Sequence, residues 1–308
     1  MNKFLSIFII IIITISCSDG SQKNKTIEEF NVSNKAIPNK EETRLKSFEI
    51  KGTEVHSIKS TINQKSYELY VKLPKSYSSS DKQYPILILT DSDYAFPLVT
   101  SITRRLNVEE FITVGISYSK DDKPTVSRTR DYTPTYSPNE PRGHSKESRL
   151  ASGKADDFIS FIKNDIFPFL EEMYRIDNSK KVFAGQSFGG LLASYMLVTT
   201  PNLFEYYLAG SPSLWYDNQC LNGFEEVYYN SHKNMKANVF LCIGEEEEKS
   251  NMVAEMLDFE KRLLSRNYSD LNIKTVIIPD EDHLSVYPSF ITKGILYAFG
   301  KEKPTNKK

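Results

Sequence analysis

Two kinds of apolar pattern follow one another along the chain from about residue 48 onward. Residues 48–58 and 66–73 alternate apolar and polar positions, which is typical of antiparallel strands with one solvated face. The later apolar runs are short and unbroken, as in strands that are buried on both faces of a sheet. These runs are residues 84–89, 111–116, 182–185, 206–209, 239–243 and 273–278. The pattern predicts two antiparallel strands at a sheet edge, with buried strands beyond them.

Helical periodicity lies between several of these runs. In residues 155–174, apolar residues recur at the spacing of one helix face. Shorter helices are predicted at 191–198, 251–266 and 288–299. Strands that alternate with helices indicate an α/β fold, in which a mostly parallel central sheet has helices on both faces. Ligands bind such sheets beyond the carboxyl ends of the strands, so we expect the chemistry in the loops that follow the strands.

Residues 1–16 have the pattern of a lipoprotein signal peptide. Lys3 is followed by almost unbroken apolar sequence over residues 4–15. That run is too short for a membrane-spanning helix, which needs about 20 apolar residues, and it is typical of an export signal. Small residues then precede Cys17 and resemble a bacterial lipobox, although Thr14 stands where Leu is usual. The resemblance implies cleavage before Cys17 and lipidation of that residue. An ordinary signal peptide with an incidental cysteine is the alternative.

Composition divides the rest of the chain into three parts. Residues 17–45 are rich in Lys, Asn, Ser and Glu without an apolar period, which predicts a flexible tether from the lipidated Cys17. Residues 46–300 are long enough for one large catalytic domain, and 301–308 form a polar tail. We therefore expect an exported protein that is lipid-anchored to a bacterial membrane, on its periplasmic or cell-surface side.

The charge balance excludes several kinds of partner. The chain has 39 Lys and Arg against 40 Asp and Glu, for a net charge of −1, and no basic stripe indicates nucleic-acid binding. No ligand cluster for a metal is visible, so neither a metal nor a cofactor is expected. No obligate protein partner is evident. The expected partners are a small-molecule ester and, through the lipid, a membrane.

A candidate nucleophile follows the third unbroken run. Residues 185–190 read GQSFGG, a Gly-x-Ser-x-Gly motif between a predicted strand and a predicted helix, which is the context of an α/β-hydrolase. A sharp turn there would force Ser187 into strained backbone angles and raise its hydroxyl above the sheet. Gly185 and Gly189 are needed because a Cβ would strike the neighbouring turn. The N–H of Phe188, at the helix start, is a candidate oxyanion donor.

A serine nucleophile needs a general base, and histidine is the usual one. The acid and the histidine follow the serine in chain order in this fold. His56 and His144 precede Ser187, and His232 lies before a predicted strand. His283 follows the last strand and is the predicted base. His144 and His232 are interpreted as solvated loop residues.

The acid is predicted only to within one run. Residues 245–248 are all Glu and follow the strand that ends near residue 243, and any of them could orient His283. Spacing in related hydrolases favours Glu247. Glu245 and Glu246 remain open, as does a Ser–His dyad that lacks a carboxylate.

A second oxyanion donor is expected in the loop after the first buried strand, residues 90–94. The candidates there are the backbone N–H groups of Asp93 and Tyr94.

Together these residues resemble the esterase-D-like superfamily of α/β-hydrolases. It includes the ferri-siderophore esterases, which open enterobactin-, salmochelin- and bacillibactin-type trilactones. The resemblance covers residues 49–299 and rests on Arg128 with 131–134, on 158–174, 185–190 and 211–215, and on His283 with Ser285 and Pro288. These motifs are specific to the superfamily and not to a substrate. Gln186 stands where His is more usual, and its side chain is expected to face away from the reaction.

Three further residues are candidates for substrate binding. Arg128 lies in the aperiodic stretch 119–154, which we expect to cover the mouth of the active site. It could bind an anionic group of the substrate, or pair with Asp131 and hold the loop. Trp215 and Tyr216 follow a strand on the ligand side, where they could stack on an aromatic substrate or pack beneath a lid.

The sequence thus predicts a serine carboxylic-ester hydrolase with an acyl-enzyme on Ser187 and His283 as general base. A siderophore-type ester is slightly favoured as the substrate. A feruloyl or acetyl ester of a polysaccharide is the alternative within hydrolysis. An acyltransferase with the same Ser–His machinery is a second alternative. A non-catalytic binding lipoprotein is a third, and the intact serine, histidine and turn argue against it.

Overall fold

The computed structural model describes residues 48–301 of the 308-residue chain. The predicted signal peptide, Cys17 and the tether over residues 17–45 lie outside the described residues, as does the polar tail beyond residue 301. Within residues 48–301, no helix is both long enough and apolar enough to span a membrane.

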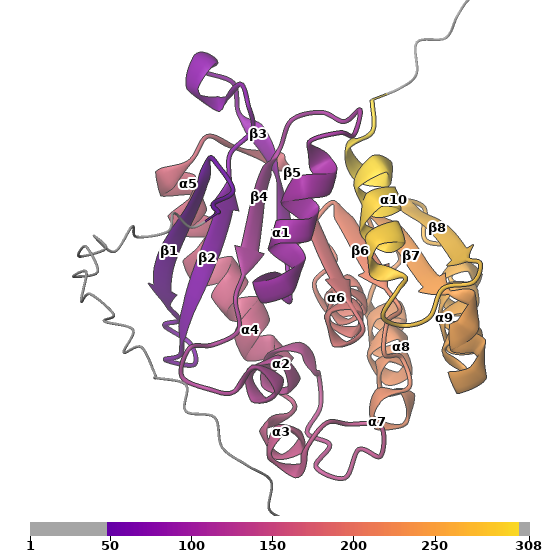
Figure 1. The fold of residues 1–308 in the computed structure, drawn as a ribbon. Coiled ribbons are helices and arrows are strands. Elements are labelled where there is room, and N and C mark those ends of the chain that lie inside the picture. The colour runs from indigo at the N-terminus through magenta and orange to yellow at the C-terminus, as the bar shows by residue number, and fades with distance from the viewer. Residues whose placement is uncertain (1–47, 302–308) are drawn as a thin grey trace, which may run out of the picture. The chain divides into compact units, whose positions relative to one another are not determined.

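Eight strands form one sheet in the described part of the chain (Figure 1). The strands are β1 (Thr53–Lys59), β2 (Ser66–Lys72), β3 (Tyr84–Leu89), β4 (Ile112–Ile116), β5 (Ile176–Gln186), β6 (Tyr206–Gly210), β7 (Ala237–Gly244) and β8 (Leu271–Ile278). Their order across the sheet is β1-β2-β4-β3-β5-β6-β7-β8. β2 is antiparallel to both β1 and β4, and every other pair is parallel. The predicted antiparallel edge and the mostly parallel sheet are therefore confirmed.

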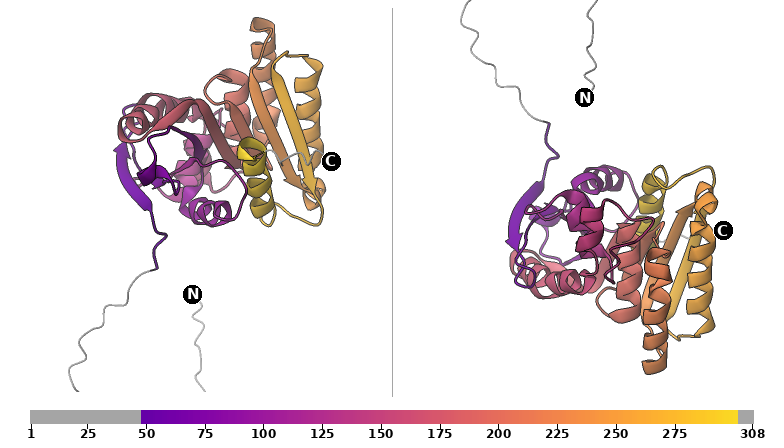
Figure 2. Two further views of the ribbon diagram at one scale, coloured as in Figure 1. Left: turned by 90° about the horizontal axis from the view of Figure 1, so that it is seen from above. Right: turned by 90° about the horizontal axis from the view of Figure 1, so that it is seen from below.

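Helices cover both faces of this sheet, as expected. They are α1 (Ser92–Thr103), α2 (Pro124–Tyr132), α3 (Lys146–Ala151), α4 (Ala155–Phe161), α5 (Phe167–Met173), α6 (Phe188–Thr199), α7 (Tyr216–Gln219), α8 (Leu221–Ser231), α9 (Met252–Ser265) and α10 (Tyr287–Phe299). α1 and α10 pack on one face, and α4, α5, α6, α8 and α9 pack on the other. Figure 2 shows α9 and α10 on opposite sides of the orange strands.

The two apolar cores explain why the buried strands have unbroken apolar sequences. Ile86 and Ile88 of β3 belong to the core beneath α4 to α9, whereas Leu87 and Leu89 belong to the core beneath α1 and α10. Successive side chains of a strand point to opposite faces, so a strand covered on both sides needs an apolar residue at every position.

The helical pattern differs from the prediction in that one long helix is divided and that α1, α2, α3, α7 and α8 were not predicted. The single helix expected over residues 155–174 is α4 and α5, joined by a π-helical turn at Ile162–Ile166. α1 was not predicted, because Pro97 inside it and the Asp and Ser residues at its start indicate a turn. It forms because Ala95, Phe96 and Val99 are buried against the sheet. Tertiary packing thus outweighs the local preference.

The carboxyl ends of the parallel strands all lie at the edge where α2, α3 and α7 are found (Figure 1). The stretch 119–154, which we expected to cover the active-site mouth, contains α2 and α3. This edge is where the site must be built.

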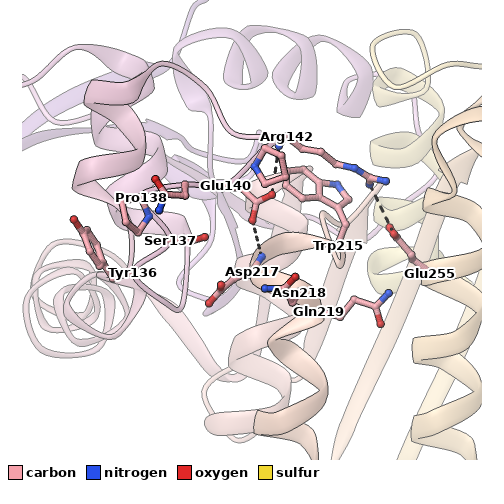
Figure 3. A pocket seen from close by; sticks show the side chains of 12 residues that line it. Tyr136, Ser137, Pro138, Glu140, Arg142, Trp215, Asp217, Asn218, Gln219 and Glu255 are labelled. Carbon is pink, nitrogen blue, oxygen red and sulfur yellow. Dashed lines mark hydrogen bonds and ion pairs between the residues drawn. The ribbon is translucent and has the colours of Figure 1, made fainter.

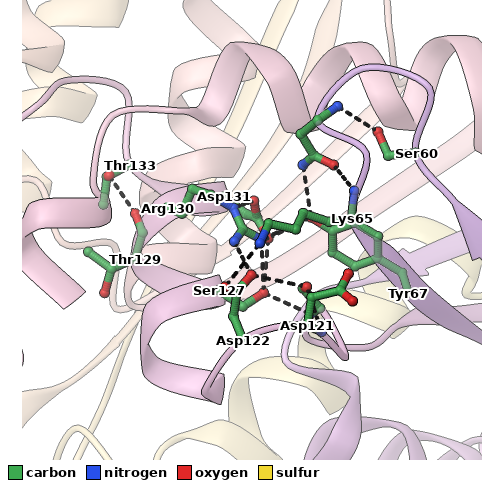
Figure 4. Close-up of polar contacts among 12 residues, drawn as sticks. Ser60, Lys65, Tyr67, Asp121, Asp122, Ser127, Thr129, Arg130, Asp131 and Thr133 are labelled. Atoms are coloured by element: carbon green, nitrogen blue, oxygen red, sulfur yellow. Dashed lines mark hydrogen bonds and ion pairs between the residues drawn. The ribbon is translucent and has the colours of Figure 1, made fainter. Parts of the chain in front are cut away.

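A buried polar network fixes α2 against β2 (Figure 4). The carboxylate of Asp131 accepts hydrogen bonds from Arg130 Nε at 2.8 Å and from the hydroxyls of Tyr67 and Ser127, both at 3.0 Å. Arg130 also pairs with Asp122. Asp131 is 1% exposed, so each lost donor would leave a buried charge less well satisfied. The partner of Asp131 is therefore Arg130, which corrects the expected pairing with Arg128.

Replacing Tyr67 with Phe tests this network. We expect Tyr67→Phe to lower the free energy of unfolding by about 1–3 kcal/mol, because a buried carboxylate loses a donor without gaining water. Chemical denaturation followed by circular dichroism measures the change.

Tyr70→Phe on the same strand is the matched control. The Tyr70 hydroxyl donates to Glu68 and Asp93 at 3.2 Å in a partly exposed setting, where water can replace it, so its removal should change stability by less than about 0.5 kcal/mol. Equal effects of the two variants would contradict a stabilising role for the buried network.

Candidate active site

Ser187 lies in the sharp turn between β5 and α6. Its backbone angles, φ 60° and ψ −117°, are strained for any residue with a side chain. The Ser187 N–H donates to the carbonyl of Gly210 on β6 at 2.8 Å, which holds the turn against the neighbouring strand. The motif therefore produces the exposed-hydroxyl geometry that the sequence predicts for a nucleophile.

Two glycines permit this turn. A Cβ at Gly185 would lie 2.5 Å from the backbone of Gly189, and a Cβ at Gly189 would lie 2.6 Å from the hydroxyl of Thr90. Both distances are too short for real atoms. Glycine at position 185 therefore lets β5 approach the start of α6, and glycine at position 189 lets α6 approach Thr90 in the turn after β3.

Glu247 is the one of the four consecutive glutamates that contacts His283. Its Oε2 lies 2.6 Å from His283 Nδ1. Its Oε1 accepts hydrogen bonds from the Ser211 hydroxyl at 2.6 Å and from the Gly244 N–H at 3.0 Å. The residue is 4% exposed. A buried carboxylate with three donors is well placed to fix the orientation of an imidazole.

The neighbouring glutamates have other partners. Glu246 pairs with Lys249, and Glu245 accepts a long hydrogen bond of 3.4 Å from the N–H of Asp280. The geometry thus selects Glu247 among the alternatives left open by the sequence. Ser211, which holds its second oxygen, was not assigned a role; the only sequence signal for it was its place in the segment 211–215.

Ser187 and His283 do not form a hydrogen bond with each other within the described residues. The Ser187 hydroxyl instead lies 3.3 Å from the hydroxyl of Ser213. Such nucleophile–base contacts are often long in the absence of substrate and shorten when it binds. Both groups stand at the carboxyl ends of strands, β5 and β8, where the reaction is expected.

The side chain of Gln186 bonds to the backbone of the loop that carries the predicted base. Its Nε2 donates to the backbone carbonyl of His283 at 2.6 Å. It is 6% exposed. The residue before the nucleophile is therefore bonded to the residue predicted to be the base.

The candidate oxyanion donors are distinguished by their contacts. The N–H of Phe188 lies at the first residue of α6, where a helix leaves its N–H groups without internal partners. The N–H of Tyr94 donates to the Asp91 carbonyl at 3.2 Å within the first turn of α1. It is therefore occupied, and the geometry favours Asp93 over Tyr94 as the second donor.

Arg128 holds the framework together and does not extend toward a ligand. Its Nε and Nη2 donate to the two carboxylate oxygens of Asp91 at 2.8 and 3.1 Å, and Nη2 also donates to the carbonyl of Gln186 at 3.1 Å. Burial lowers the pKa of Arg128, but the Asp91 carboxylate outweighs this and keeps that pKa above its ordinary value. Of the two roles left open by the sequence, these contacts favour the structural one, with Asp91 as the partner of Arg128.

His144 is an exposed loop residue, as the sequence predicts, and it lies beside the start of α6. Its ring packs edge-on against Phe188, with ring centroids 5.6 Å apart. Burial and the nearby Arg128 guanidinium lower the pKa of His144.

The two aromatic candidates separate in the structure. Tyr216 is 1% exposed and its hydroxyl donates to the carbonyl of Thr135 at 2.8 Å, so it packs beneath the covering loop and does not face a substrate. Trp215 is partly exposed and packs against Phe188 at 5.8 Å between ring centroids. Of the two, only Trp215 can meet a ligand.

Trp215 lines a pocket of about 660 Å³, here called the Trp215 pocket (Figure 3). Its other lining residues are 136–142, 217–219 and Glu255. The guanidinium of Arg142 lies 5.3 Å from the centre of the Trp215 ring and 3.7 Å from Glu255 Oε1. Burial raises the pKa of Glu255. The volume is that of a typical small-molecule site.

The described residues hold no cluster of three or more His, Cys, Asp or Glu side chains that could bind a metal. The chemistry that this edge of the sheet can perform is nucleophilic: a strained serine, an imidazole oriented by a carboxylate, and N–H groups at a helix start.

Comparison with known proteins places these residues in a family context. A family model described as "Putative esterase" matches residues 60–283. The ferri-bacillibactin esterase BesA of Bacillus subtilis (strain 168) is 27% identical over 270 residues, which cover 84% of this chain and 93% of that protein.

Solved structures are similar as well. An IroE-like serine hydrolase from Shewanella oneidensis has a TM-score of 0.71 at 27% identity, with 80% of this chain and 79% of that one covered. The BES protein from Bacillus cereus has a TM-score of 0.71 at 26% identity, with 83% and 98% covered.

The contact between Glu247 and His283 can be tested by the reactivity of Ser187. We expect Glu247→Gln to slow labelling of Ser187 by a fluorophosphonate by about 10²- to 10⁴-fold, because an amide cannot stabilise the imidazolium that forms during attack. The labelling rate is read by mass spectrometry of the intact protein.

Glu245→Gln and Glu246→Gln are the matched controls, since they make the same chemical change one and two residues away. Both should label at the rate of the unaltered protein. A slow control together with a normal Glu247→Gln variant would assign the acid to another glutamate.

Proposed function

Because this chain belongs to the esterase family whose model it matches, and is a carboxylic-ester hydrolase, we propose that it cleaves its ester through an acyl-enzyme on Ser187. The observation that carries the proposal is the contact of 2.6 Å between His283 and the buried Glu247, at the same edge of the sheet as the strained Ser187. A histidine held in this way is prepared to accept the proton of a serine hydroxyl.

The reaction follows from these positions. Ser187 Oγ attacks the ester carbonyl while His283 Nε2 takes its proton, and Glu247 stabilises the imidazolium. The N–H groups of Phe188 and Asp93 bind the oxyanion of the tetrahedral intermediate. When the intermediate collapses, His283 gives the proton to the leaving alcohol and the acyl group remains on Ser187. Water, deprotonated by His283, then releases the acid and restores the serine.

A siderophore-type ester is the substrate class we favour. The relative BesA is a ferri-bacillibactin esterase by name, and the likeness covers 93% of it. The Trp215 pocket supports this choice, because Trp215 contacts the ring of Phe188, whose N–H is a proposed oxyanion donor. An aromatic part of the ester would lie against Trp215 while the scissile carbonyl meets Ser187.

We also propose that the mature protein starts at a lipidated Cys17 and acts outside the cytoplasm at a membrane surface. The support is the short apolar run followed by small residues and Cys17. This part of the chain lies outside the described residues.

The substrate proposal is tested with a panel of a ferri-catecholate trilactone, a feruloyl ester and short-chain acyl esters. We expect turnover without any added acceptor alcohol, the highest kcat/KM on the trilactone, and no turnover by Ser187→Ala. Activity that required an acceptor alcohol would identify an acyltransferase, and activity only on feruloyl or acetyl sugar esters would overturn the siderophore assignment.

Binding gives an independent measure with the same substrates. Trp215 is the only tryptophan of the chain, so the fluorescence of Ser187→Ala protein reports directly on the Trp215 pocket. The favoured ester should change this fluorescence in a saturable way. Saturable binding that leaves the fluorescence unchanged would place the ester elsewhere.

The membrane proposal is tested by expressing the full chain in a bacterium fed an alkyne-labelled fatty acid. The unaltered chain should incorporate the label and sediment with membranes, whereas Cys17→Ser should do neither. Cys220→Ser is the control, because it removes a thiol of the catalytic domain and should keep both properties. An unlabelled, soluble wild-type chain would indicate an ordinary signal peptide.

A further inference from the structure

We propose that Gln186 is a positioning residue that sets where the base stands relative to the nucleophile. The inference rests on the proposed function, in which His283 is the base of Ser187. It concerns a residue whose side chain touches neither the substrate nor the reacting atoms, and which acts through the backbone of His283.

Gln186 makes hydrogen bonds on both sides of the site, to the loop of His283 and to Arg128 beside the Ser187 turn. Its side-chain Nε2 donates to the His283 carbonyl at 2.6 Å, and its own carbonyl accepts from Arg128 Nη2 at 3.1 Å. Ser187 is the next residue along the chain. The buried Gln186 is therefore bonded both to Arg128, beside the turn that holds Ser187, and to the backbone of the base.

The loop that carries His283 makes few other contacts with the turn that contains Ser187. The His283 side chain is 38% exposed and Leu284 is 84% exposed. The Asp282 carboxylate accepts the N–H groups of Leu284 and Ser285, so those bonds stay inside the loop. The Glu281 carbonyl accepts from the N–H of Glu246, which ties the loop to the turn after β7.

His283 is thus fixed at two points. Glu247 holds the ring through Nδ1, and Gln186 holds the backbone from the strand of the nucleophile. Glu247 alone leaves the ring free to move with its loop. With Gln186 in place, the residue that precedes Ser187 also holds the backbone of His283, and this limits the distance between the imidazole and the serine. A misplacement of about 1 Å in such a site costs about 100-fold in rate.

Replacing Gln186 with Met tests the loss of the donor. Met has a similar length, stays apolar in a buried position and cannot donate to the carbonyl. We expect kcat to fall about 10- to 100-fold with KM nearly unchanged, because the substrate pocket is intact while the base is displaced. The melting temperature and circular dichroism should show a folded protein.

Replacing Gln186 with Glu gives a readout that a merely structural role would not move. A protonated carboxyl group can donate to the His283 carbonyl, whereas an ionised one repels it, and burial favours the protonated form. The ratio of variant to wild-type kcat should therefore be highest at low pH and fall as the pH rises. The other charged groups around the contact are Glu247 from the turn after β7, Asp282 from the loop, and Arg128 with Asp91 from α2 and the β3–α1 turn. They are present in both proteins, so the ratio reports what the substitution itself changes.

Gln64→Glu and Gln64→Met are the matched controls. Gln64 Nε2 also donates to a backbone carbonyl, that of Thr61 at 2.9 Å, but in the exposed turn between β1 and β2. These variants should keep wild-type kcat at every pH. A Gln186→Met variant within twofold of wild type, or a Gln186→Glu ratio that does not change with pH, would overturn the inference.

A failure of the role proposed for Gln186 can be distinguished from a failure of the proposed function. An active wild type with inactive Ser187→Ala and His283→Ala variants upholds the proposed function whatever Gln186 does. If His283→Ala retains wild-type activity, the proposed base is wrong, and the role of Gln186 fails with it.

Discussion

The ion pair between Arg128 and Asp91 lies where several parts of the candidate site meet. Asp91 lies in the turn between β3 and α1, and Arg128 comes from α2. The third hydrogen bond of the guanidinium reaches the carbonyl of Gln186 at the end of β5. The hydroxyl of Tyr118, just after β4, donates to Asp91 at 2.7 Å. A buried pair of this kind is costly to form and far more costly to break, because each ion has given up its water. The segment 119–154, which carries Arg128, is therefore fixed to the carboxyl ends of β3 and β5.

From that pair, hydrogen bonds extend outward to the groups of the proposed reaction. Arg128 holds the Gln186 backbone, the Gln186 side chain holds His283, and Glu247 fixes the His283 ring. Ser211 and Gly244 then satisfy the second oxygen of Glu247. Except for His283, the side chains in this series are buried or nearly so, and an unpaired polar group there would cost more than in water. This satisfaction makes the constellation rigid, which general-base catalysis needs.

Local patterns in the sequence sufficed for features that local physics determines. The run 84–89 predicts a strand because both faces of β3 are covered, and the motif 185–190 predicts the turn because only glycine fits at two of its positions. His283 follows from chain order. Other features depend on which distant residues meet. Asp131, three residues from Arg128, was the natural partner to propose, yet Arg130 holds it and Asp91, far away in sequence, holds Arg128.

The same limit applies to the side chains of Tyr216 and Gln186. Both stand beside functional positions, and nothing in the sequence around them tells which way they point. Tyr216 is covered by the loop that carries Thr135, and Gln186 meets a loop 97 residues further along the chain. The sequence likewise did not tell which of the four consecutive glutamates is the acid. Glu247 differs from its neighbours in its contacts with Ser211 and His283, and these contacts depend on the fold.

Backbone strain gathers at this edge of the sheet. Four strands are followed, at the strand end or shortly beyond it, by a non-glycine residue with positive φ: Asp91 after β3, Ser187 after β5, Ser211 after β6 and Asp280 after β8. Each such residue costs about 1–3 kcal/mol, and chains keep such strain where the surroundings over-determine it. Here the surroundings are the buried ion pair, the Glu247 contacts and the two packed apolar cores. The strain turns the chain sharply at each strand end. Around these turns the Ser187 hydroxyl lies 3.3 Å from that of Ser213, and the Ser211 hydroxyl donates to Glu247 at 2.6 Å. Packing of the two cores thus offsets the cost of the strained turns at the strand ends.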